Sequence, residues 1–389
     1  MASTPSTTTV PCIFSLPNEL LVAICSMGQE GRVPNFQAAF KSERILSQVS
    51  QHFRRVIVGA PALWSLVEAD LGVVGSVELA HLYLERSQKC CLWVSLKDPA
   101  EVDLDLIADR LSQITLHIHH RIWRLQIAFG PDSWNTVSRA FLGLSPSQLT
   151  SLTHLEFRGE SYSDSPDAHL FAIVALTAQC TPLVYLYLHL GLVTFPHQHR
   201  LAIPSLKHLH LSVQEEEGTP HLLDVMDLFD TPALTSLTFH NTHGDQIFEL
   251  FNATSLPHAS FAAVTTLVFV SNPCTCDEDV DPFTQTIPSP PIRLFPALSS
   301  LSLINQCFTS LLVDAILGPT SQPWRLLQTI TLCPNRDLEE VHLALDPRRG
   351  QIFPTLRLSS ELASRVQDWE ATDATVEVFD PSELLNFPE

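Results

Sequence analysis

Leu183-Val-Tyr-Leu186-Tyr-Leu188 and Leu206-Lys-His-Leu209-His-Leu211 share one pattern, with apolar residues at the first, fourth and sixth positions. In each segment the last four residues alternate between apolar leucine and a more polar side chain. Such alternation is typical of a short strand that buries one face. The pattern therefore predicts two strands whose leucines point into a core and whose tyrosines and histidines point the other way.

The same pattern occurs eight times between residues 122 and 332. Successive copies lie 23 to 34 residues apart when counted between their fourth positions. Recurrence at nearly constant spacing indicates a repeat architecture, in which each unit buries its apolar face against its neighbours. The fourth positions are Leu125, Leu155, Leu186, Leu209, Leu237, Leu267, Leu301 and Ile330.

Amphipathic helices are expected between these strands, over residues 167–180, 219–229 and 306–317. A strand, a turn and a helix or loop at about thirty residues resembles the leucine-rich repeat. That resemblance implies an α/β fold, with a parallel concave sheet inside and helices outside. The repeats vary in length and lack the family's Asn or Cys after the strand. We therefore expect an irregular solenoid over 122–354, with a C-terminal cap over 355–389 and a long, mobile loop over 271–291.

The N-terminal part of the sequence is of another kind. Helices are expected over 15–24 and 44–58, because apolar residues recur at helical spacing, followed by a short piece ending at Leu63-Trp64. We assign a three-helix module to 12–66 and linking helices with a first strand to 67–121. Residues 1–11 are expected to be a disordered tail, without the charged and apolar regions of a secretion signal.

Three stretches of this module resemble an F-box of the fungal type: Leu16-Pro-Asn-Glu-Leu-Leu21, Leu46-Ser-Gln-Val-Ser-Gln-His-Phe-Arg54 and Ala60-Pro-Ala-Leu-Trp64. The resemblance implies a module that docks a Skp-type adaptor, and through it a cullin, while the repeats hold a protein target for ubiquitin transfer. Ser50 and Phe53 stand where the family usually has Cys and Trp, and the segment 27–43 is longer than usual. The expected adaptor-binding residues are Leu16, Pro17, Leu20, Leu21, Ile24, Val49 and Phe53. The alternative is that these helices only cap the solenoid.

Strand alternation places a second set of candidate residues on the concave face. A surface rich in Tyr and His combines apolar area with hydrogen bonding, which suits protein recognition. Two other interpretations stay open: a metal or pH-sensitive site built from the histidines, and a merely solvated polar face. The expected target-binding residues are Glu156, Arg158, Tyr185, Tyr187, His189, His208, His210 and His240.

Charge and composition narrow the function classes. Lys and Arg number 22 and Asp and Glu 42, a formal net charge of −20, so nucleic acid and anionic membranes are unfavourable partners. No apolar run approaches the ~20 residues of a membrane span. Nine scattered cysteines do not suit a disulfide framework, which favours a reducing compartment, the cytoplasm or nucleus.

Motifs of nucleophilic, phosphate-binding or zinc-dependent enzymes are missing from the sequence, and we expect no catalytic residue, no cofactor and no metal. Cys274-Thr-Cys276 has no second Cys/His pair at zinc-finger spacing. The sequence thus favours a non-catalytic substrate receptor of a ubiquitin ligase. The rival is a protein-interaction scaffold without adaptor binding, and an enzyme with an unfamiliar site is least supported.

Overall fold

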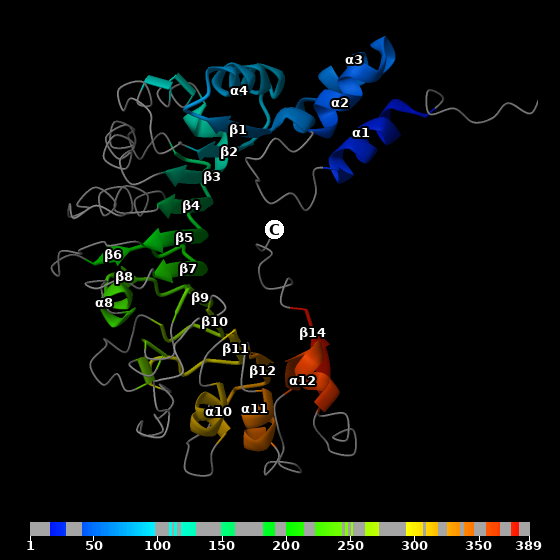
Figure 1. Cartoon of the computed structure of the whole chain (residues 1–389). Helices are drawn as coiled ribbons and strands as arrows, with labels where there is room; N and C mark the ends of the chain where they lie inside the picture. The colour runs from blue at the N-terminus through cyan, green and yellow to red at the C-terminus, as the bar shows by residue number, and fades with distance from the viewer. Residues whose placement is uncertain are drawn as a thin grey trace, which may run out of the picture. The chain divides into compact units, whose positions relative to one another are not determined.

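The structure is a computed structural model of the chain, coloured along the sequence in Figure 1. It describes residues 16–28, 41–97, 109–110, 113–114, 118–129, 149–159, 182–190, 200–213, 222–242, 246–247, 250–251, 261–271, 293–305, 309–317, 325–334, 338–345, 355–365 and 375–380. The chain divides into two compact units, Met1–Ala128 and Phe129–Glu389. The fold is α/β, and twelve of the described strands belong to a large parallel sheet.

The first unit begins with helices whose bounds differ from those predicted, 15–24 and 44–58. α1 spans Asn18–Met27, but the single helix expected over 44–58 is two helices, α2 (Ser42–Val49) and α3 (Gln51–Val58). Ser50 between them is extended (φ −158°, ψ 167°), and its hydroxyl accepts a hydrogen bond from the amide of Phe53 at 3.2 Å. A serine in this conformation is a favourable N-cap, so it ends one helix and starts the next.

A short 3-10 helix, η2 (Pro61–Trp64), leads from α3 into a β-α-β arrangement. β1 (Leu66–Asp70), α4 (Val74–Arg86), β2 (Leu92–Lys97), η3 (His119–Arg121) and β3 (Ile122–Phe129) follow, and β2 pairs in parallel with both β1 and β3. The buried Trp64 donates from its indole nitrogen to the carbonyl of Ile57 at 2.9 Å and packs edge-on against Tyr83 of α4. Trp64 therefore connects α3 with α4.

The second unit contains the repeated strands that the sequence predicts. Neighbouring strands pair in parallel, and the pattern stays in register from strand to strand, as in Leu209↔Leu237 and Leu237↔Leu267. In sheet order the strands are β4 (His154–Gly159), β5 (Tyr185–Leu190), β7 (His208–Val213), β9 (Ser236–His240), β10 (Thr266–Val270), β11 (Ser300–Ile304), β12 (Thr329–Cys333), β13 (Thr355–Ser359) and β14 (Val376–Phe379).

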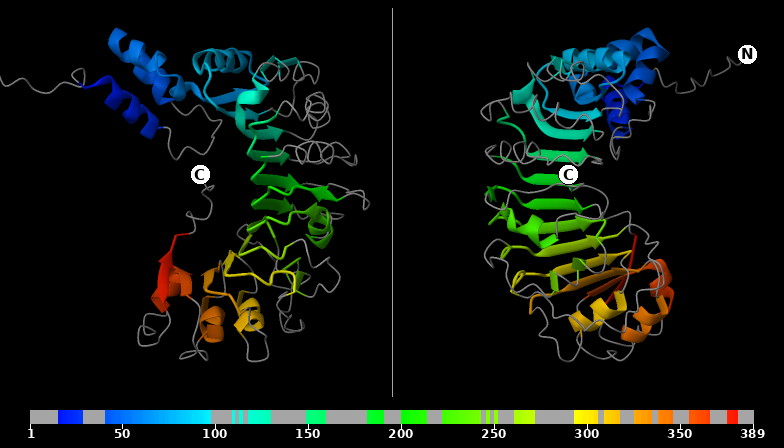
Figure 2. Two further views of the ribbon diagram at one scale, coloured as in Figure 1. Left: turned by 180° about the vertical axis from the view of Figure 1, so that it is seen from behind. Right: turned by 60° about the vertical axis from the view of Figure 1, so that its left-hand side comes forward.

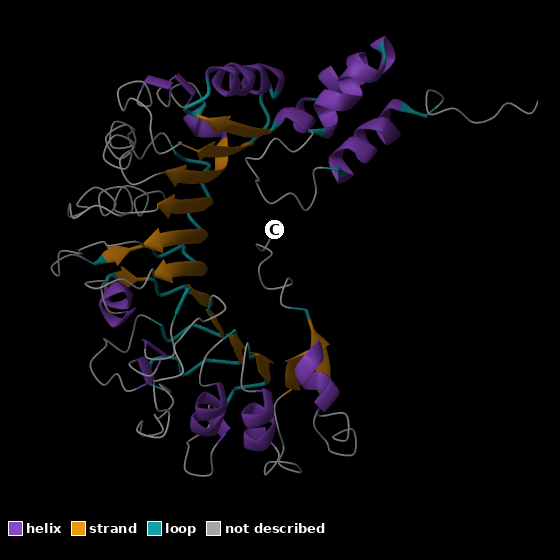
Figure 3. Ribbon diagram, viewed as in Figure 1, coloured by secondary structure: helices purple, strands orange, loops and turns teal. Residues whose placement is uncertain are grey.

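Within this unit the strands follow a curve, and α8 (Leu222–Asp227), α10 (Thr309–Leu317) and α11 (Leu338–Leu345) lie on its convex side (Figure 1). The view from behind in Figure 2 shows the same arrangement, and Figure 3 separates its strands from its helices by colour. The remaining elements are α12 (Ser360–Arg365) and a small two-stranded sheet of β6 (Leu201–Ala202) and β8 (Phe229–Asp230).

The core of the second unit follows the repeated pattern. Every leucine or isoleucine at the fourth position from Leu155 to Ile330 is at most 1% exposed. The side chains two residues later, such as Leu188, Phe239 and Phe269, are also buried, and the last two stack at 5.4 Å between ring centroids. Burial of this second set fits a two-residue alternation, although the intervening residues of β9 to β12, Thr238, Val268, Ser302 and Thr331, are buried as well.

A ladder of polar contacts precedes the strands and was not predicted. In three successive repeats the residue after the first apolar position contacts its counterpart in the preceding repeat: the amides of Thr235, Thr265 and Ser299 donate to the carbonyls of Lys207, Thr235 and Thr265, each at 2.9 Å. The three hydroxyls donate to the same carbonyls at 3.1 Å. These contacts satisfy backbone groups just outside the sheet, where the regular ladder has not yet begun.

The helices expected over 219–229 and 306–317 correspond to the shorter α8 and α10, while the expected helix over 167–180 and almost all of the loop over 271–291 lie outside the described residues. In the described ranges no helix has both the length and the apolar composition that crossing a membrane requires.

Candidate functional site

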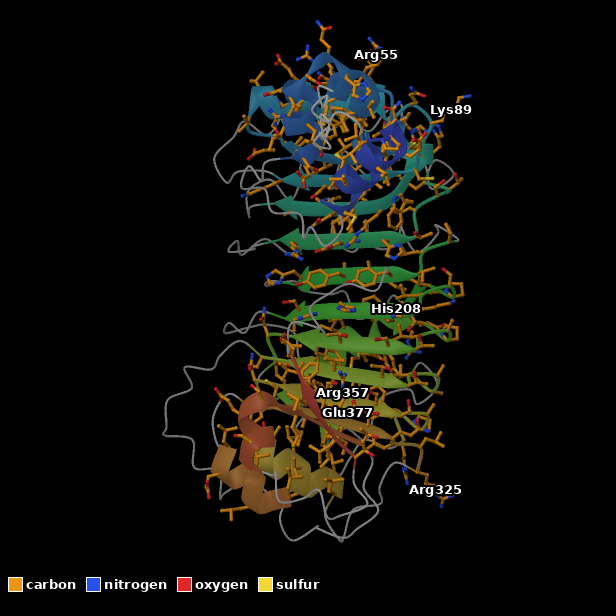
Figure 4. The ribbon with its side chains drawn as sticks, turned by 90° about the vertical axis from the view of Figure 1, so that its right-hand side faces the viewer. Arg55, Lys89, His208, Arg325, Arg357 and Glu377 are labelled. Atoms are coloured by element: carbon orange, nitrogen blue, oxygen red, sulfur yellow. The ribbon has the colours of Figure 1, made fainter. Side chains whose placement is uncertain are left out.

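Aromatic and imidazole rings gather on one face of four neighbouring strands in the second unit. Tyr185 is in register with His208, and Tyr187 with His210. Because alternate side chains point to opposite sides of a strand, these four rings share the face that the buried leucines leave free. Figure 4 looks onto the concave side of the unit and shows His208 there. We call this surface the ring face; its members are His154, Tyr185, Tyr187, His208, His210 and His240.

The rings are in contact across the strands. His154 stacks on Tyr185 with centroids 5.6 Å apart, and Tyr185 lies 5.0 Å from His210. His210 in turn stacks on His240 at 5.5 Å, and Tyr187 lies 5.6 Å from His240. Tyr185 is buried, whereas Tyr187, His208, His210 and His240 are half-buried, so the face offers ring surface to a partner.

Two histidines of the ring face form a hydrogen-bonded pair. Nδ1 of His210 and Nε2 of His240 are 3.3 Å apart, so one nitrogen carries the proton and the other accepts it. Burial, with the neighbouring His240 and His208, lowers the pKa of His210 to about 3. Burial, with Arg158 and His189, lowers the pKa of His240 to about 4. Both imidazoles are therefore neutral at pH 7.

Ser212 of β7 makes two side-chain contacts beside the ring face. Its hydroxyl is 2.8 Å from Nδ1 of His189 and accepts a hydrogen bond from the side-chain amide of Asn241 at 2.9 Å. Asn241 directly follows β9 in the left-handed conformation (φ 57°), which asparagine tolerates better than most residues. Ser212 and Asn241 were not predicted as site residues. The only indication of them in the sequence is that a serine and an asparagine stand at the ends of predicted strands.

Glu156 and Arg158 lie on the same face, on β4. The guanidinium of Arg158 contacts Oε1 of Glu156 at 2.6 Å through both Nε and a terminal nitrogen. The carboxylate is almost completely buried, while 41% of the Arg158 side chain is exposed. The guanidinium carbon is 5.4 Å from the ring centroid of Tyr187, a distance at which a cation is attracted to the ring face. The pKa of Tyr187 is raised mainly by burial, so its phenol keeps its proton.

The predicted target-binding residues thus come together on the four strands, although Glu156 and Tyr185 are buried. Within the described ranges no three His, Cys, Asp or Glu side chains lie in a group suited to a metal ion. This face can offer a partner the surfaces of its rings, hydrogen bonds from neutral imidazoles, and one cation, Arg158, that is already paired with Glu156.

A second surface lies on the first two helices. Five large apolar side chains there are roughly half-exposed or more, which we call the helical surface: Leu20 (50%), Ile24 (50%) and Met27 (68%) on α1, with Ile45 (45%) and Val49 (52%) on α2. Exposed apolar side chains at helical spacing are typical of a docking surface. Sequence reasoning missed Met27 and Ile45, although both continue the helical spacing of the predicted residues.

The seven predicted adaptor-binding residues divide between surface and interior. Pro17, Leu20, Ile24 and Val49 are exposed and Leu16 is half-buried, whereas Leu21 and Phe53 are buried with Cys25 and Ile57. A groove of about 610 Å³ lies between α1 and α3. It is lined by Asn18, Glu19, Val22, His52, Arg55, Val56, Gly59 and Ala60.

Comparison of the sequence with models of known families and with curated proteins found no match.

Proposed function

We propose that the protein is a non-catalytic substrate receptor of a Skp/cullin/F-box ubiquitin ligase, working in the cytoplasm or nucleus. The helical surface supports this proposal most directly, because five apolar side chains on two short helices are left in contact with water. A partner that covered them would remove that apolar area from water, at roughly 25 cal/mol per Å². The resemblance of the same helices to an F-box implies that this partner is a Skp-type adaptor.

The second unit would supply the other half of the receptor. A curved sheet of parallel strands presents the ring face, which has the aromatic character common in protein interfaces. The receptor would act by position: a target held on the ring face and an adaptor held on the helices raise the effective concentration of the target near the ubiquitin-loaded enzyme.

One contact favours the rival scaffold function. Tyr83 of α4 donates a hydrogen bond to the buried Glu43 of α2, which ties the helices to the first β-α-β arrangement. Helices fixed in this way would also serve to cap the solenoid without binding an adaptor. The two functions differ in what binds the exposed apolar residues of α1.

Co-purification distinguishes them. Tagged full-length protein should recover a Skp-type adaptor and a cullin, and Leu20→Asp with Ile24→Asp should abolish that recovery, because each change places a charge in the apolar contact. Val73→Asp with Val74→Asp is the matched control, since these valines are equally exposed in the same unit but lie outside the helical surface. Absence of the adaptor from the wild-type sample would refute the proposal and support the scaffold.

A further inference from the structure

Two adjacent cysteines, Cys90 and Cys91, lie in the turn between α4 and β2. Neither is in a disulfide, and Cys91 is exposed while Cys90 is half-buried. The other cysteines of the described ranges, Cys25 and Cys333, are buried. Lys89, directly before the pair, points away from the ribbon into solvent (Figure 4). The turn therefore presents two neighbouring thiols at the surface of the first unit.

Arg121 of η3 holds this turn in place. Its Nε donates to the carbonyl of Cys90 at 3.0 Å, and a terminal nitrogen donates to the hydroxyl of Ser87 at 2.7 Å. The amide of Cys90 also donates to the carbonyl of Ser87 at 2.9 Å. Gln88 between them has the left-handed conformation (φ 50°) that is common just after a helix. These contacts fix the backbone of the pair, so that a bound ligand does not have to order it.

Both thiols lie near the same positive charge. Burial lowers the pKa of Arg121, while the sulfurs of Cys90 and Cys91 act in the opposite direction, so both of them interact with its guanidinium. The guanidinium stays protonated at neutral pH. A fixed positive charge beside the thiols disfavours a metal dication there, because like charges repel. It does not disfavour an uncharged group that is bound by the two sulfurs.

The adjacency of the two cysteines favours a bridging atom over a disulfide. Consecutive Cα atoms are about 3.8 Å apart, whereas the Cα atoms of disulfide-bonded cysteines are usually about 4.4–6.8 Å apart. A direct bond between the sulfurs of Cys90 and Cys91 would therefore be strained. One atom inserted between the sulfurs lengthens the bridge and relieves this strain. Trivalent arsenic is a soft acceptor of the kind that thiolates prefer, and it can hold two sulfurs and one further group.

We propose that Cys90 and Cys91 form a binding site for trivalent arsenicals. With an arsenoxide, R–As=O, two S–As bonds form, and the oxygen leaves as water with the two thiol protons. Arsenic stays trivalent and neither sulfur is oxidised, so the step needs no oxidant or reductant. The product carries no charge, which is compatible with the adjacent guanidinium of Arg121. The site lies outside the helical surface and the ring face, and the inference does not depend on the proposed function.

Protection of the thiols from alkylation tests the proposal. Reduced full-length protein is treated with phenylarsine oxide, washed with the monothiol 2-mercaptoethanol and alkylated with N-ethylmaleimide, and 1,2-ethanedithiol then removes the arsenic. Trypsin cleavage after Lys89 and Lys97 releases residues 90–97, which contain both cysteines of the pair and no other. Mass spectrometry should show this peptide with both thiols unalkylated, whereas without phenylarsine oxide both should be alkylated.

Single serine variants test whether both sulfurs are needed. In Cys90→Ser and Cys91→Ser the remaining thiol should be protected at least about tenfold less than in wild type, because one sulfur no longer keeps the arsenic near the other. Cys274→Ser with Cys276→Ser, which removes the other closely spaced pair of the sequence, is the matched control and should leave residues 90–97 protected.

Alkylation of residues 90–97 in treated wild type would overturn the proposal. Wild-type protection of the remaining thiol in either single variant would overturn it too, because one sulfur would then suffice. If a serine variant fails to fold, wild type alone decides: washing with 1,2-ethanedithiol in place of the monothiol should abolish the protection. Protection that survives the dithiol wash would show that arsenic does not cause it, and would also overturn the proposal.

Discussion

The phenol of Tyr83 in α4 donates a hydrogen bond to the buried carboxylate of Glu43 in α2, forty residues earlier in the chain. Burial, together with the nearby Glu43 carboxylate, raises the pKa of Tyr83, so the phenol remains a donor. Lys41 adds a second link, because its ammonium lies 4.4 Å from the Tyr83 ring centroid and 3.0 Å from Glu68 of β1. The helices and the first β-α-β arrangement are therefore one structural unit.

Tyr83→Phe should destabilise the first unit by about 1–3 kcal/mol, since it removes a donor from a buried carboxylate without changing the packed ring. Urea unfolding followed by tryptophan fluorescence measures the change, because Trp64 packs against Tyr83. Glu43→Gln combined with Tyr83→Phe is the control: the double variant should lose less than the sum of the single losses. Strict additivity would show that the contact does not contribute.

The strands of the second unit were predictable because their periodicity is local. Each segment has its apolar residues at fixed positions, so the fourth-position residues from Leu155 to Ile330 were correctly expected in the core. β1 and β2 lie outside the eight predicted repeats, although Val67 and Ala69 of β1 and Val94 and Leu96 of β2 are buried at the same two-residue spacing and pair in register. β13 and β14 likewise extend the sheet into the segment expected to cap it.

The candidate sites were predictable in their composition but not in their contacts. Alternation placed Tyr187 and His210 on one face, yet the pairing of His210 with His240 depends on how strands thirty residues apart stack. Burial of Leu21 and Phe53 is decided by the packing of the helices, which helical spacing alone does not give. The break at Ser50 was missed for a related reason: the apolar spacing continues across it, while its hydroxyl caps a new helix.

Ser50→Ala should lower the stability of the first unit by about 1 kcal/mol, because the amide of Phe53 loses the hydroxyl that caps α3. Ser50→Asp is the matched control, since aspartate is an equally good N-cap and should keep the wild-type stability. Thermal unfolding monitored by circular dichroism measures both variants. An alanine variant as stable as wild type would show that α2 and α3 are not separated by this cap.

The stability of the second unit should fall as the pH is lowered from about 7 to 5.5. The pKa values of His210 and His240 are about 3 and 4 when the chain is folded, below the usual 6.5, so the unfolded chain binds more protons in this range. Stability from these groups is therefore fully present above pH 6.5 and is lost as the pH falls toward 4. The expected loss from the pair between pH 7 and 5.5 is about 2 kcal/mol.

Urea unfolding at pH 7 and pH 5.5 measures this dependence. His210→Gln with His240→Gln should flatten it, because glutamine does not titrate. His81→Gln, which changes an exposed histidine of α4, should leave the dependence as in wild type. A double variant that loses as much stability as wild type over this range would contradict the assignment of the effect to the ring face.

Leu237→Asp should disturb more of the second unit than its own repeat. Leu237 is fully buried and stands in register between Leu209 of β7 and Leu267 of β10. A carboxylate in that position costs several kcal/mol or forces local unfolding, and stacked repeats depend on their nearest neighbours. Hydrogen exchange should therefore show lost amide protection in β7 and β10 as well as in β9.

Leu343→Asp on α11, where the side chain is 59% exposed, is the matched control and should leave the protection of these strands unchanged. Loss of protection confined to residues 230–250 would instead mean that the repeats fold as separate small domains.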